Sequence, residues 1–314
     1  MSAPDEPSAL RYTARRIARH LRWARTEGIA RLVEEDRLDP VARLRTALAK
    51  RRWRRRYGVP PGTARPVYLV GLQRSGTNML VRGLDTAPEF EVRNENDRRL
   101  FHRFQLRSDE LLVAAIQRSR HAYVLVKPLC QSHRVDELLA LPQVRPGRAI
   151  WAWRDVDDRA RSEVAKFGAA NLRALRAIAD GTIGQRWPGQ RLDAETTDLI
   201  RSFDLDRMDP HSGAALFWYV RNSLVFRLGL AGRPDVLLCR YEDLVADPAG
   251  QVARLCRFLD FPYHPRLSAH IEPRTPRRRP LPLDQRLRAL CAELTDRLAA
   301  ASATPVSGTE TVRG

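Results

Sequence analysis

Cysteine is scarce in this sequence of 314 residues, and its spacing forms no familiar pattern. The four cysteines lie far apart and include no C-x-x-C pair, which argues against a disulfide framework and against a zinc site built on such pairs. We therefore expect reduced thiols in a reducing compartment. The seven histidines also lack the spacing of metal ligands, so we expect no metal site. The cysteines are Cys130, Cys239, Cys256 and Cys291.

Long apolar runs are missing as well. No segment approaches the roughly 20 consecutive apolar residues that a membrane-spanning helix requires. The first ten residues, MSAPDEPSAL, do not contain the apolar stretch of a secretory signal. These absences predict a soluble protein of the cytoplasm.

Acidic residues are too few to balance the basic ones. The chain has 37 Asp and Glu against 55 Lys and Arg, which gives a formal net charge of +18. Residues 1–65 alone hold 17 basic and 7 acidic residues. A basic segment of this kind is most often a solvated surface, but it also suits contact with nucleic acid or with an anionic membrane.

Apolar residues and arginines alternate at helical spacing over residues 8–56, which predicts amphipathic helices, and Pro60-Pro61-Gly62 then interrupts the pattern. We place a domain boundary there. The predicted organisation is a basic helical N-terminal extension over residues 1–62, a main domain over residues 63–300 and a disordered tail over residues 301–314.

Short apolar runs alternate with helical patterns from residue 66 onward. This alternation predicts an α/β fold in three layers, α/β/α, with helices on both faces of a central parallel sheet. The predicted strands cover residues 67–70, 90–93, 123–126, 149–153 and 236–239. The predicted helices cover residues 77–84, 97–118, 214–228, 248–259 and 283–300, with a further helix that begins at residue 157.

The first strand runs into a glycine-containing turn and then a helix, in the segment VYLVGLQRSGTNMLVR of residues 67–82. Backbone N–H groups of such a turn converge on an anion at the N-terminus of the helix. Gly71 and Gly76 match the two glycines of the ATP-binding P-loop, G-x-x-x-x-G-K-[ST]. However, Thr77 replaces its lysine, and Asn78 replaces its magnesium-binding hydroxyl. The turn is therefore predicted to bind a nucleotide-borne anion other than that of magnesium ATP.

Further anion donors accompany this P-loop-like turn. Arg74, Ser75 and Thr77 add side-chain donors to it, and an arginine in such a cradle can stabilise charge on a leaving phosphate without a metal ion. Arg154 follows a predicted strand, at the edge where open α/β sheets bind ligands. Ser162 comes about two helical turns later, so an arginine and a hydroxyl can together hold a second, terminal phosphate.

In combination, three segments resemble the sulfotransferases that use 3′-phosphoadenosine 5′-phosphosulfate (PAPS). GLQRSGTN at residues 71–78 is similar to the 5′-phosphosulfate loop of that family, and WRDVDDRARS at residues 153–162 is similar to its 3′-phosphate site. RYEDLVADP and CRFLDFP, at residues 240–248 and 256–262, are similar to its C-terminal signature. The resemblance covers residues 66–280. The arginine in the loop is closer to the bacterial and protein-tyrosine members than to the cytosolic ones.

The resemblance implies both the cofactor contacts and the catalytic residues, which are Arg74, Lys127 and Glu95. The cytosolic branch uses the histidine of a Lys-Thr-His segment as its base, whereas only Lys127 of that segment is matched here. Glu95 lies at the position of the glutamate base of the tyrosine-sulfating branch and is favoured, with His133 as the weaker rival. The implied cofactor-binding residues are Gln73, Arg74, Ser75, Gly76, Thr77, Asn78, Arg154, Ser162, Lys166 and Tyr241.

The activity that the resemblance implies is transfer of the sulfuryl group of PAPS to a hydroxyl or amine acceptor, by an in-line displacement that needs no metal ion. We expect a small-molecule, carbohydrate or lipid-linked acceptor. Residues 171–210 contain Gly181, Gly184 and Gly189 and have no strong period, so we interpret them as an irregular insertion or lid. This segment and the aromatic helix around Trp218 are the predicted walls of the acceptor site.

Two other functions fit part of the sequence. A P-loop nucleotide kinase is the nearest competing enzyme, but it needs the lysine and the hydroxyl that the turn lacks. A nucleic-acid-binding protein that acts through residues 1–56 is the alternative from another class, although we do not expect nucleic acid as a partner of a sulfotransferase. A third hypothesis adds to the first: the N-terminal basic helices contact an anionic membrane, which makes the protein membrane-peripheral and brings it to a lipid-linked acceptor.

Overall fold

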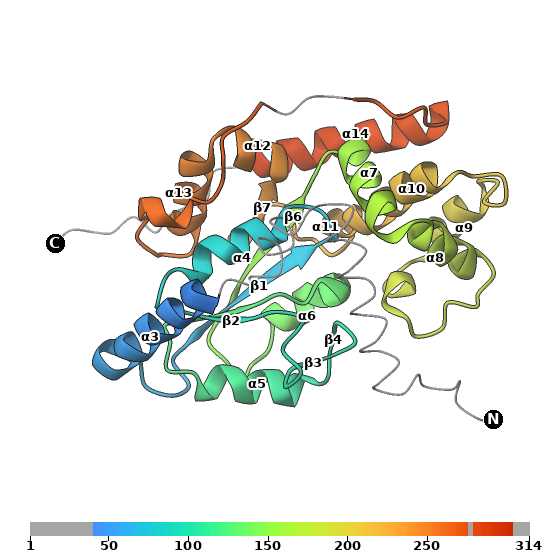
Figure 1. Cartoon of the computed structure of the whole chain (residues 1–314). Helices are drawn as coiled ribbons and strands as arrows, with labels where there is room; N and C mark the ends of the chain where they lie inside the picture. The colour runs from blue at the N-terminus through green and yellow to red at the C-terminus, as the bar shows by residue number, and fades with distance from the viewer. Residues whose placement is uncertain (1–39, 276–278, 304–314) are drawn as a thin grey trace. The chain divides into compact units, whose positions relative to one another are not determined.

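A five-stranded sheet in the order β2-β5-β1-β6-β7 forms the centre of the fold (Figure 1). Every neighbouring pair of its strands is parallel. The computed structural model describes residues 40–275 and 279–303. The strands are β1 (Arg65–Gly71), β2 (Phe90–Arg93), β5 (Tyr123–Val126), β6 (Arg148–Trp153) and β7 (Val236–Arg240). All five predicted strands are therefore confirmed.

Helices pack on both faces of this sheet. The helices that follow β1 are α4 (Thr77–Asp85), α5 (Asp109–Arg118), α6 (Val135–Leu139), α7 (Val156–Phe167), α8 (Ala170–Ala179), α9 (Ala194–Arg201), α10 (Pro210–Asn222), α11 (Leu224–Arg227), α12 (Tyr241–Ala246), α13 (Pro248–Phe258) and α14 (Gln285–Ala303). Among the described residues, short 3-10 helices form at η1 (Leu129–Arg134), η2 (Trp187–Gly189) and η3 (Pro265–Leu267).

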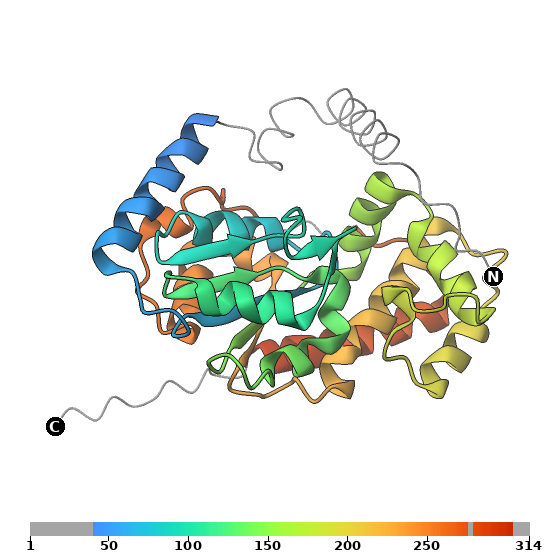
Figure 2. The same cartoon turned by 90° about the horizontal axis from the view of Figure 1, so that it is seen from below.

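Two apolar cores separate the layers. Successive side chains of a strand point to opposite faces of a sheet. Accordingly, Tyr68 and Val70 of β1 join a core with α5, α6, α8, α10 and α14, whereas Val67 and Leu69 join a second core with α4, α12 and α13. The helices lie on either side of the sheet in both views (Figure 1 and Figure 2). The predicted three-layer α/β/α architecture is thus confirmed.

One predicted helix is partly wrong. Residues 97–118 were expected to be mostly helical, but only α5 forms there, and the preceding residues make a hairpin of β3 (Phe101–His102) and β4 (Gln105–Leu106). The two residues of its turn, Arg103 and Phe104, have φ of 49° and 71°. Such turns are normally marked by Asn or Gly, and neither residue is present here to indicate it.

Two segments are more helical than predicted. Residues 171–210 hold most of α8 and all of α9, joined by a loop that contains η2. Residues 241–246, which lie between the predicted strand at 236–239 and the predicted helix at 248–259, form α12, and this helix leads into α13 through Asp247. Asp247 accepts a hydrogen bond from the N–H of Gly250 at 2.9 Å, and Pro248 opens α13 as predicted.

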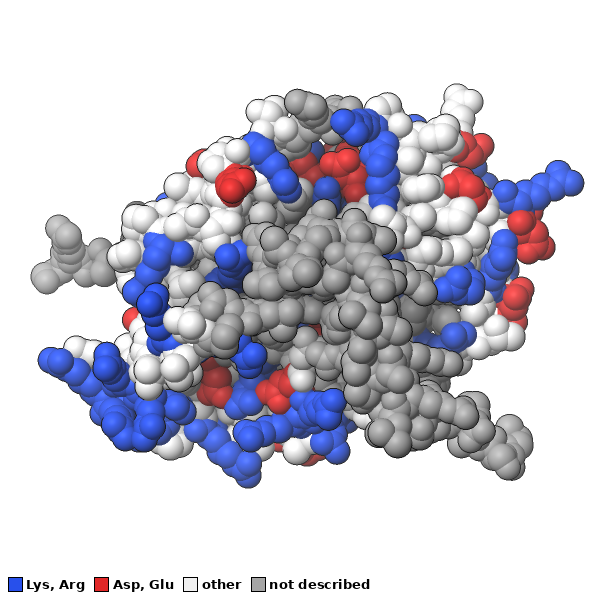
Figure 3. Space-filling view, in the orientation of Figure 1, with Lys and Arg blue, Asp and Glu red and all other residues white. Residues whose placement is uncertain are grey.

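The chain divides into two units, residues 1–53 and residues 54–314. In the first unit the structure describes the beginning of α3 (Pro40–Tyr57), a helix with eight Lys and Arg and no Asp or Glu. Figure 3 shows the basic atoms gathered over α3 at the lower left. The helix predicted between residues 8 and 39 lies outside the described residues, as do residues 304–314 of the predicted tail.

All four cysteines are free and buried in the core. Over residues 40–275 and 279–303, no helix is both long enough and apolar enough to cross a membrane. The same part of the chain contains no group of three or more His, Cys, Asp or Glu arranged to hold a metal ion.

Candidate active site

The predicted site residues follow the carboxyl ends of all five parallel strands. Residues 71–78, which we call the anion loop, end β1 and begin α4. Glu95 comes after β2, Lys127 after β5, Arg154 after β6 and Tyr241 after β7. The carboxyl ends of parallel strands meet at one edge of a sheet, where open α/β folds bind their ligands. The topology therefore brings five separate segments of the chain to that edge.

Close contacts require glycine at two positions of the anion loop. Gly71 has φ of 116°, and a Cβ atom there would lie 2.2 Å from the carbonyl oxygen of Ala152 on β6. Gly76 has φ of 83°, and its Cβ would lie 2.6 Å from the ring of Tyr241. Arg74 adopts a left-handed φ of 71° without being glycine, a conformation that costs roughly 1–3 kcal/mol. The neighbouring strand and the tyrosine ring thus leave no room for side chains at these two glycines.

The anion loop presents hydrogen-bond donors with no protein acceptor. The N-cap residue of α4 is Gly76, which has no side chain to cap the helix, so the first turn of α4 can direct N–H groups at an anion. The hydroxyl of Ser75 is buried, and its Oγ has no hydrogen-bond partner within residues 40–275 and 279–303. A buried polar group without a partner costs about 1–3 kcal/mol. An anion bound in the loop offsets this cost.

Two arginines connect the anion loop with the segment after β6. Arg74 donates from Nε to Oγ of Ser162 on α7, 2.8 Å away. Arg154 donates from Nη1 to the carbonyl oxygen of Arg74 at 3.4 Å, and its guanidinium lies 4.3 Å from the centre of the Tyr241 ring. Lys166 lies one turn beyond Ser162, in the last turn of α7. The residues predicted for the 5′-phosphate and for the 3′-phosphate are therefore in direct contact.

Core residues hold Arg154 in place. Trp218 donates from its indole N–H to the carbonyl oxygen of Arg154 at 2.9 Å. Glu242 accepts from the backbone N–H of Asp155 at 3.1 Å, and its carboxylate lies 4.0 Å from Nε of Arg154. Trp218 is fully buried, so its own side chain is not exposed to an acceptor. It packs in the core and supports Arg154 instead. The prediction that residues 171–210 and the helix around Trp218 form the walls of the acceptor site stays a prediction.

A carboxylate and a lysine meet beside the anion loop. Lys127 donates from Nζ to Oδ1 of Asn78 at 2.7 Å, and its Nζ lies 3.5 Å from Oε2 of Glu95. Only 10% of the Lys127 side chain and 14% of the Glu95 side chain are exposed. Burial raises the pKa of Glu95 above its ordinary value, while Lys127 opposes this shift by favouring the charged form. A carboxylate with a raised pKa is suited to accept a proton during a reaction.

His133, the rival base, has less suitable surroundings. Its imidazole is buried in η1, and burial together with the nearby charge of Arg221 lowers its pKa to about 4. Its Nδ1 has no hydrogen-bond partner in the part of the chain that the structure describes. An imidazole with this pKa is neutral at pH 7 and accepts a proton weakly. These surroundings favour Glu95 over His133.

Three residues outside the predicted set support the site. The hydroxyl of Ser132 accepts a hydrogen bond from the N–H of Gly71 at 2.9 Å and donates one to the carbonyl oxygen of Gly71 at 3.1 Å. Arg274 donates to the hydroxyl of Tyr241. Arg159 is fully buried and donates to the carbonyl oxygen of Gln73 at 3.3 Å. No local pattern marks Ser132 or Arg159, because their partners come from distant parts of the chain.

Residues 64–274 match the sulfotransferase domain family, and this match covers more than half of the chain. The chain belongs to the sulfotransferase family. The recognition based on the three sequence segments is thereby confirmed.

This sulfotransferase is similar in fold to three solved structures. A sulfotransferase from Alicyclobacillus acidocaldarius is 18% identical, with a TM-score of 0.40, over 76% of this chain and 96% of that one. The sulfotransferase domain of the Synechococcus PCC 7002 olefin synthase is 17% identical, with a TM-score of 0.44, over 78% and 96%. The sulfotransferase domain from the curacin biosynthetic pathway is 14% identical, with a TM-score of 0.42, over 76% and 98%. No curated protein matches the sequence.

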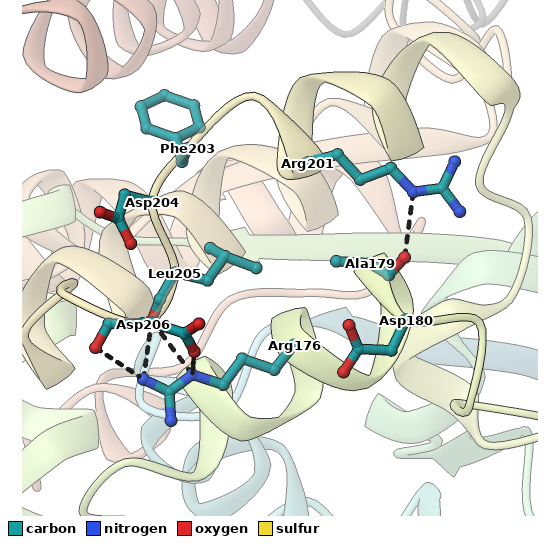
Figure 4. A pocket seen from close by; sticks show the side chains of 8 residues that line it. All are labelled: Arg176, Ala179, Asp180, Arg201, Phe203, Asp204, Leu205 and Asp206. Atoms are coloured by element: carbon teal, nitrogen blue, oxygen red, sulfur yellow. Dashed lines mark hydrogen bonds and ion pairs between the residues drawn. The ribbon is translucent and has the colours of Figure 1, made fainter.

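The sulfotransferase also has a pocket of about 410 Å³ between the ends of α8 and α9 and the loop that follows α9 (Figure 4). None of the predicted site residues lines it. Arg176 donates to the carbonyl oxygen of Leu205 at 2.7 and 3.0 Å, and Arg201 donates to that of Ala179 at 3.0 Å. The guanidinium groups of this pocket therefore bind the protein's own backbone.

Proposed function

We propose that this sulfotransferase transfers the sulfuryl group of PAPS to a hydroxyl or amine acceptor. The observation that carries this proposal is the contact between two groups of anion-binding residues at the ends of the strands. One group is the anion loop, and the other is formed by Arg154 and Ser162. Two such groups suit a nucleotide with phosphates at both its 5′ and 3′ positions.

The residues present fit this cofactor. The orphaned hydroxyl of Ser75 and the uncapped N-terminus of α4 offer donors to a 5′-phosphosulfate. Arg154 and Ser162, with Lys166 one turn further along α7, would hold the 3′-phosphate. Tyr241 lies between Gly76 and the guanidinium of Arg154, where its ring would border the nucleotide. The remaining proposed contacts are Gln73, Arg74, Thr77 and Asn78 of the anion loop.

PAPS supplies the sulfuryl group, and adenosine 3′,5′-bisphosphate is its leaving group. Glu95 takes the proton of the acceptor as the new bond to sulfur forms, and a base of this kind contributes about 10²–10⁴-fold. Arg74 stabilises the charge that develops on the departing phosphate oxygen, where one such donor is worth on the order of 10²–10³ in rate. Lys127 orients Glu95 and Asn78 and supplies a positive charge next to both.

The reaction proposed here needs no metal ion, because side chains at the anion loop supply the positive charge that magnesium supplies in a P-loop enzyme. Asn78 replaces the hydroxyl that binds magnesium in a P-loop, and its Oδ1 already accepts a hydrogen bond from Lys127. The positive charge at the loop comes from arginine and lysine side chains instead. A kinase, by contrast, relies on magnesium to neutralise its phosphates.

Incubation of the protein with PAPS and a panel of acceptors tests the proposal. The panel should contain phenols, carbohydrates and lipid-linked saccharides, because small-molecule, carbohydrate and lipid-linked acceptors all agree with the site. We expect release of adenosine 3′,5′-bisphosphate that depends on one acceptor class and persists in EDTA. Phosphorylation of an acceptor from ATP and magnesium, with no turnover of PAPS, would favour the kinase alternative.

We further propose that α3 contacts an anionic membrane surface. Val41, Leu44 and Leu48 recur at helical spacing, and their exposed fractions are 56%, 61% and 44%. The basic residues of α3 continue to its C-terminal end, and each Lys or Arg near an anionic bilayer contributes about 1 kcal/mol. Exposed aliphatic side chains next to basic ones suit a lipid surface, which buries the aliphatic side chains and attracts the basic ones, better than a nucleic-acid backbone, which attracts only the basic ones.

Co-sedimentation with vesicles tests this contact. We expect binding to vesicles that contain phosphatidylglycerol and none to vesicles of phosphatidylcholine alone. Leu44→Asp together with Leu48→Asp should abolish it, whereas Arg107→Gln, a change outside α3, should not. Binding to duplex DNA that survives the leucine substitutions and falls steeply with salt would point to nucleic acid instead.

A further inference from the structure

Arg159 of α7 is a fully buried arginine that contacts the anion loop. Its guanidinium donates three hydrogen bonds, to the carbonyl oxygen of Gln73 at 3.3 Å, to Oδ1 of Asn171 at 2.7 Å and to the carbonyl oxygen of Ala214 at 3.3 Å. Glu163 supplies the opposite charge, with its Oε2 3.1 Å from Nη2 of Arg159, but these two atoms make no hydrogen bond among the described residues. A charge this deeply buried is stable only when it is paired and hydrogen-bonded, and here the ion pair and the three hydrogen bonds provide that stabilisation. Arg159 thereby joins the anion loop to α8 and α10.

The pairing with Glu163 limits what Arg159 can do electrostatically. Burial lowers the pKa of Arg159 and raises the pKa of Glu163, and each partner opposes the shift of the other. The electric fields of two opposite charges 3.1 Å apart largely cancel each other at a larger distance. Arg159 therefore adds little net positive field to a bound anion, and its effect on the loop is geometric.

We propose that Arg159 is a positioning residue for nucleotide binding. By holding the carbonyl of Gln73, Arg159 turns the backbone N–H of Arg74 toward the 5′-phosphate. This inference rests on the proposed function. The C=O and N–H of a trans peptide group point in opposite directions, and the described residues contain no cis peptide bond. Because the carbonyl of Gln73 points to the buried guanidinium, the N–H of Arg74 points away from it.

The next peptide group of the loop is held in the same manner. The carbonyl of Arg74 accepts from Arg154 at 3.4 Å, so the N–H of Ser75 points away from Arg154. Arg74 itself has the left-handed φ of 71°, which a residue with a side chain leaves readily unless its neighbours fix it. Two arginines thus orient two consecutive N–H groups, and only Arg159 does so from a position that a ligand does not reach.

Substitution of Arg159 by lysine separates this role from the ion pair. Arg159→Lys keeps a positive charge opposite Glu163, but a single amino group does not reproduce the fork of donors that reaches Gln73 as well. Arg176→Lys is the matched control, because Arg176 also binds a loop carbonyl, that of Leu205, outside the site. A double variant, Arg159→Met with Glu163→Leu, removes both charges and leaves neither one buried alone.

Titration calorimetry with adenosine 3′,5′-bisphosphate and with AMP reads out the effect. We expect Arg159→Lys to weaken the binding of both nucleotides by the same factor, about 10- to 100-fold. This factor corresponds to the loss of one hydrogen bond to a charged group. Arg176→Lys should leave both dissociation constants unchanged. The double variant should show the same loss as Arg159→Lys, and it serves as the test if Arg159→Lys does not fold.

The outcomes separate this inference from the function on which it rests. If the wild type binds the two nucleotides and Arg159→Lys binds them equally well while its melting temperature falls, Arg159 is structural and the positioning role is refuted. If the wild type binds neither nucleotide, the proposed function fails, and the positioning role fails with it.

Discussion

Replacement of Glu95 by glutamine probes the proposed chemistry most sharply. The carboxylate is 14% exposed and lies 3.5 Å from Lys127. Glutamine has the same shape and keeps an acceptor oxygen, but it cannot take a proton. The hydrogen bond from Lys127 to Asn78 does not involve Glu95 and should survive. We therefore expect Glu95→Gln to retain the fold and the binding of adenosine 3′,5′-bisphosphate.

The expected loss lies in turnover. A general base contributes about 10²–10⁴-fold, which is roughly 3–5 kcal/mol of activation free energy, so kcat should fall by that factor while the dissociation constant of the nucleotide changes less than twofold. Glu91→Gln is the matched control. Glu91 is also a partly buried glutamate and lies within β2, but it pairs with Arg93 and accepts a hydrogen bond from Ser119 at 2.6 Å. It should keep kcat within a few-fold of the wild type.

The pH dependence gives an independent check. Burial raises the pKa of Glu95, and a base acts only when deprotonated, so wild-type kcat should decline on the acid side at a higher pH than an ordinary glutamate allows. The same shift makes the folded state bind this proton more tightly than the unfolded state does. The contribution of Glu95 to the free energy of unfolding is therefore present below its ordinary pKa and is lost as pH rises through the raised pKa. Glu95→Gln should lack both effects, and near-normal kcat in this variant would refute the assignment.

Three further predictions concern the nucleotide. Gly76→Ala should abolish nucleotide binding, because the new Cβ would lie 2.6 Å from the ring of Tyr241. Gly62→Ala is the control: this glycine has a φ of 84° and open space around it, so the variant should have a lower melting temperature but intact nucleotide binding. Equal losses of nucleotide binding in the two variants would contradict the steric reasoning. Arg154→Ala should weaken the binding of adenosine 3′,5′-bisphosphate about 10- to 100-fold more than the binding of AMP. An equal loss of affinity for both nucleotides in calorimetry would refute the assignment of Arg154 to the 3′-phosphate. EDTA should leave turnover of PAPS unchanged, and a loss restored by magnesium would overturn the metal-free reaction.

The sequence was sufficient to predict the strands of the sheet, because β1, β5, β6 and β7 are short, mostly apolar runs with buried centres. The strand β2, with the sequence FEVR, is less apolar, and only Phe90 is buried in it. The sequence also identified the anion loop, whose glycines and donors are contiguous. The catalytic roles of Glu95 and Lys127 came only from the resemblance, and the contact between them was not predicted. These residues are 32 positions apart in the sequence, and they meet because β2 and β5 are neighbours in the sheet.

The misses have physical causes as well. The hairpin at Phe101–Leu106 turns through Arg103 and Phe104, residues that rarely adopt positive φ. Residues 171–210 were predicted to be irregular because of their glycines. However, Leu172, Leu175 and Ile178 recur at helical spacing in this segment, and these three buried side chains belong to α8. Arg159 and Glu163 have the i, i+4 spacing of a surface ion pair, and nothing local shows that both are buried.

The central claim is that one site binds adenosine at both a 5′- and a 3′-phosphate without a metal ion. A thermal-shift comparison of adenosine 3′,5′-bisphosphate, AMP and ATP, each with EDTA and with magnesium, tests it most directly. The account predicts the largest rise in melting temperature for adenosine 3′,5′-bisphosphate, a smaller rise for AMP, and no effect of magnesium on either. A rise that is largest for ATP and requires magnesium would contradict it.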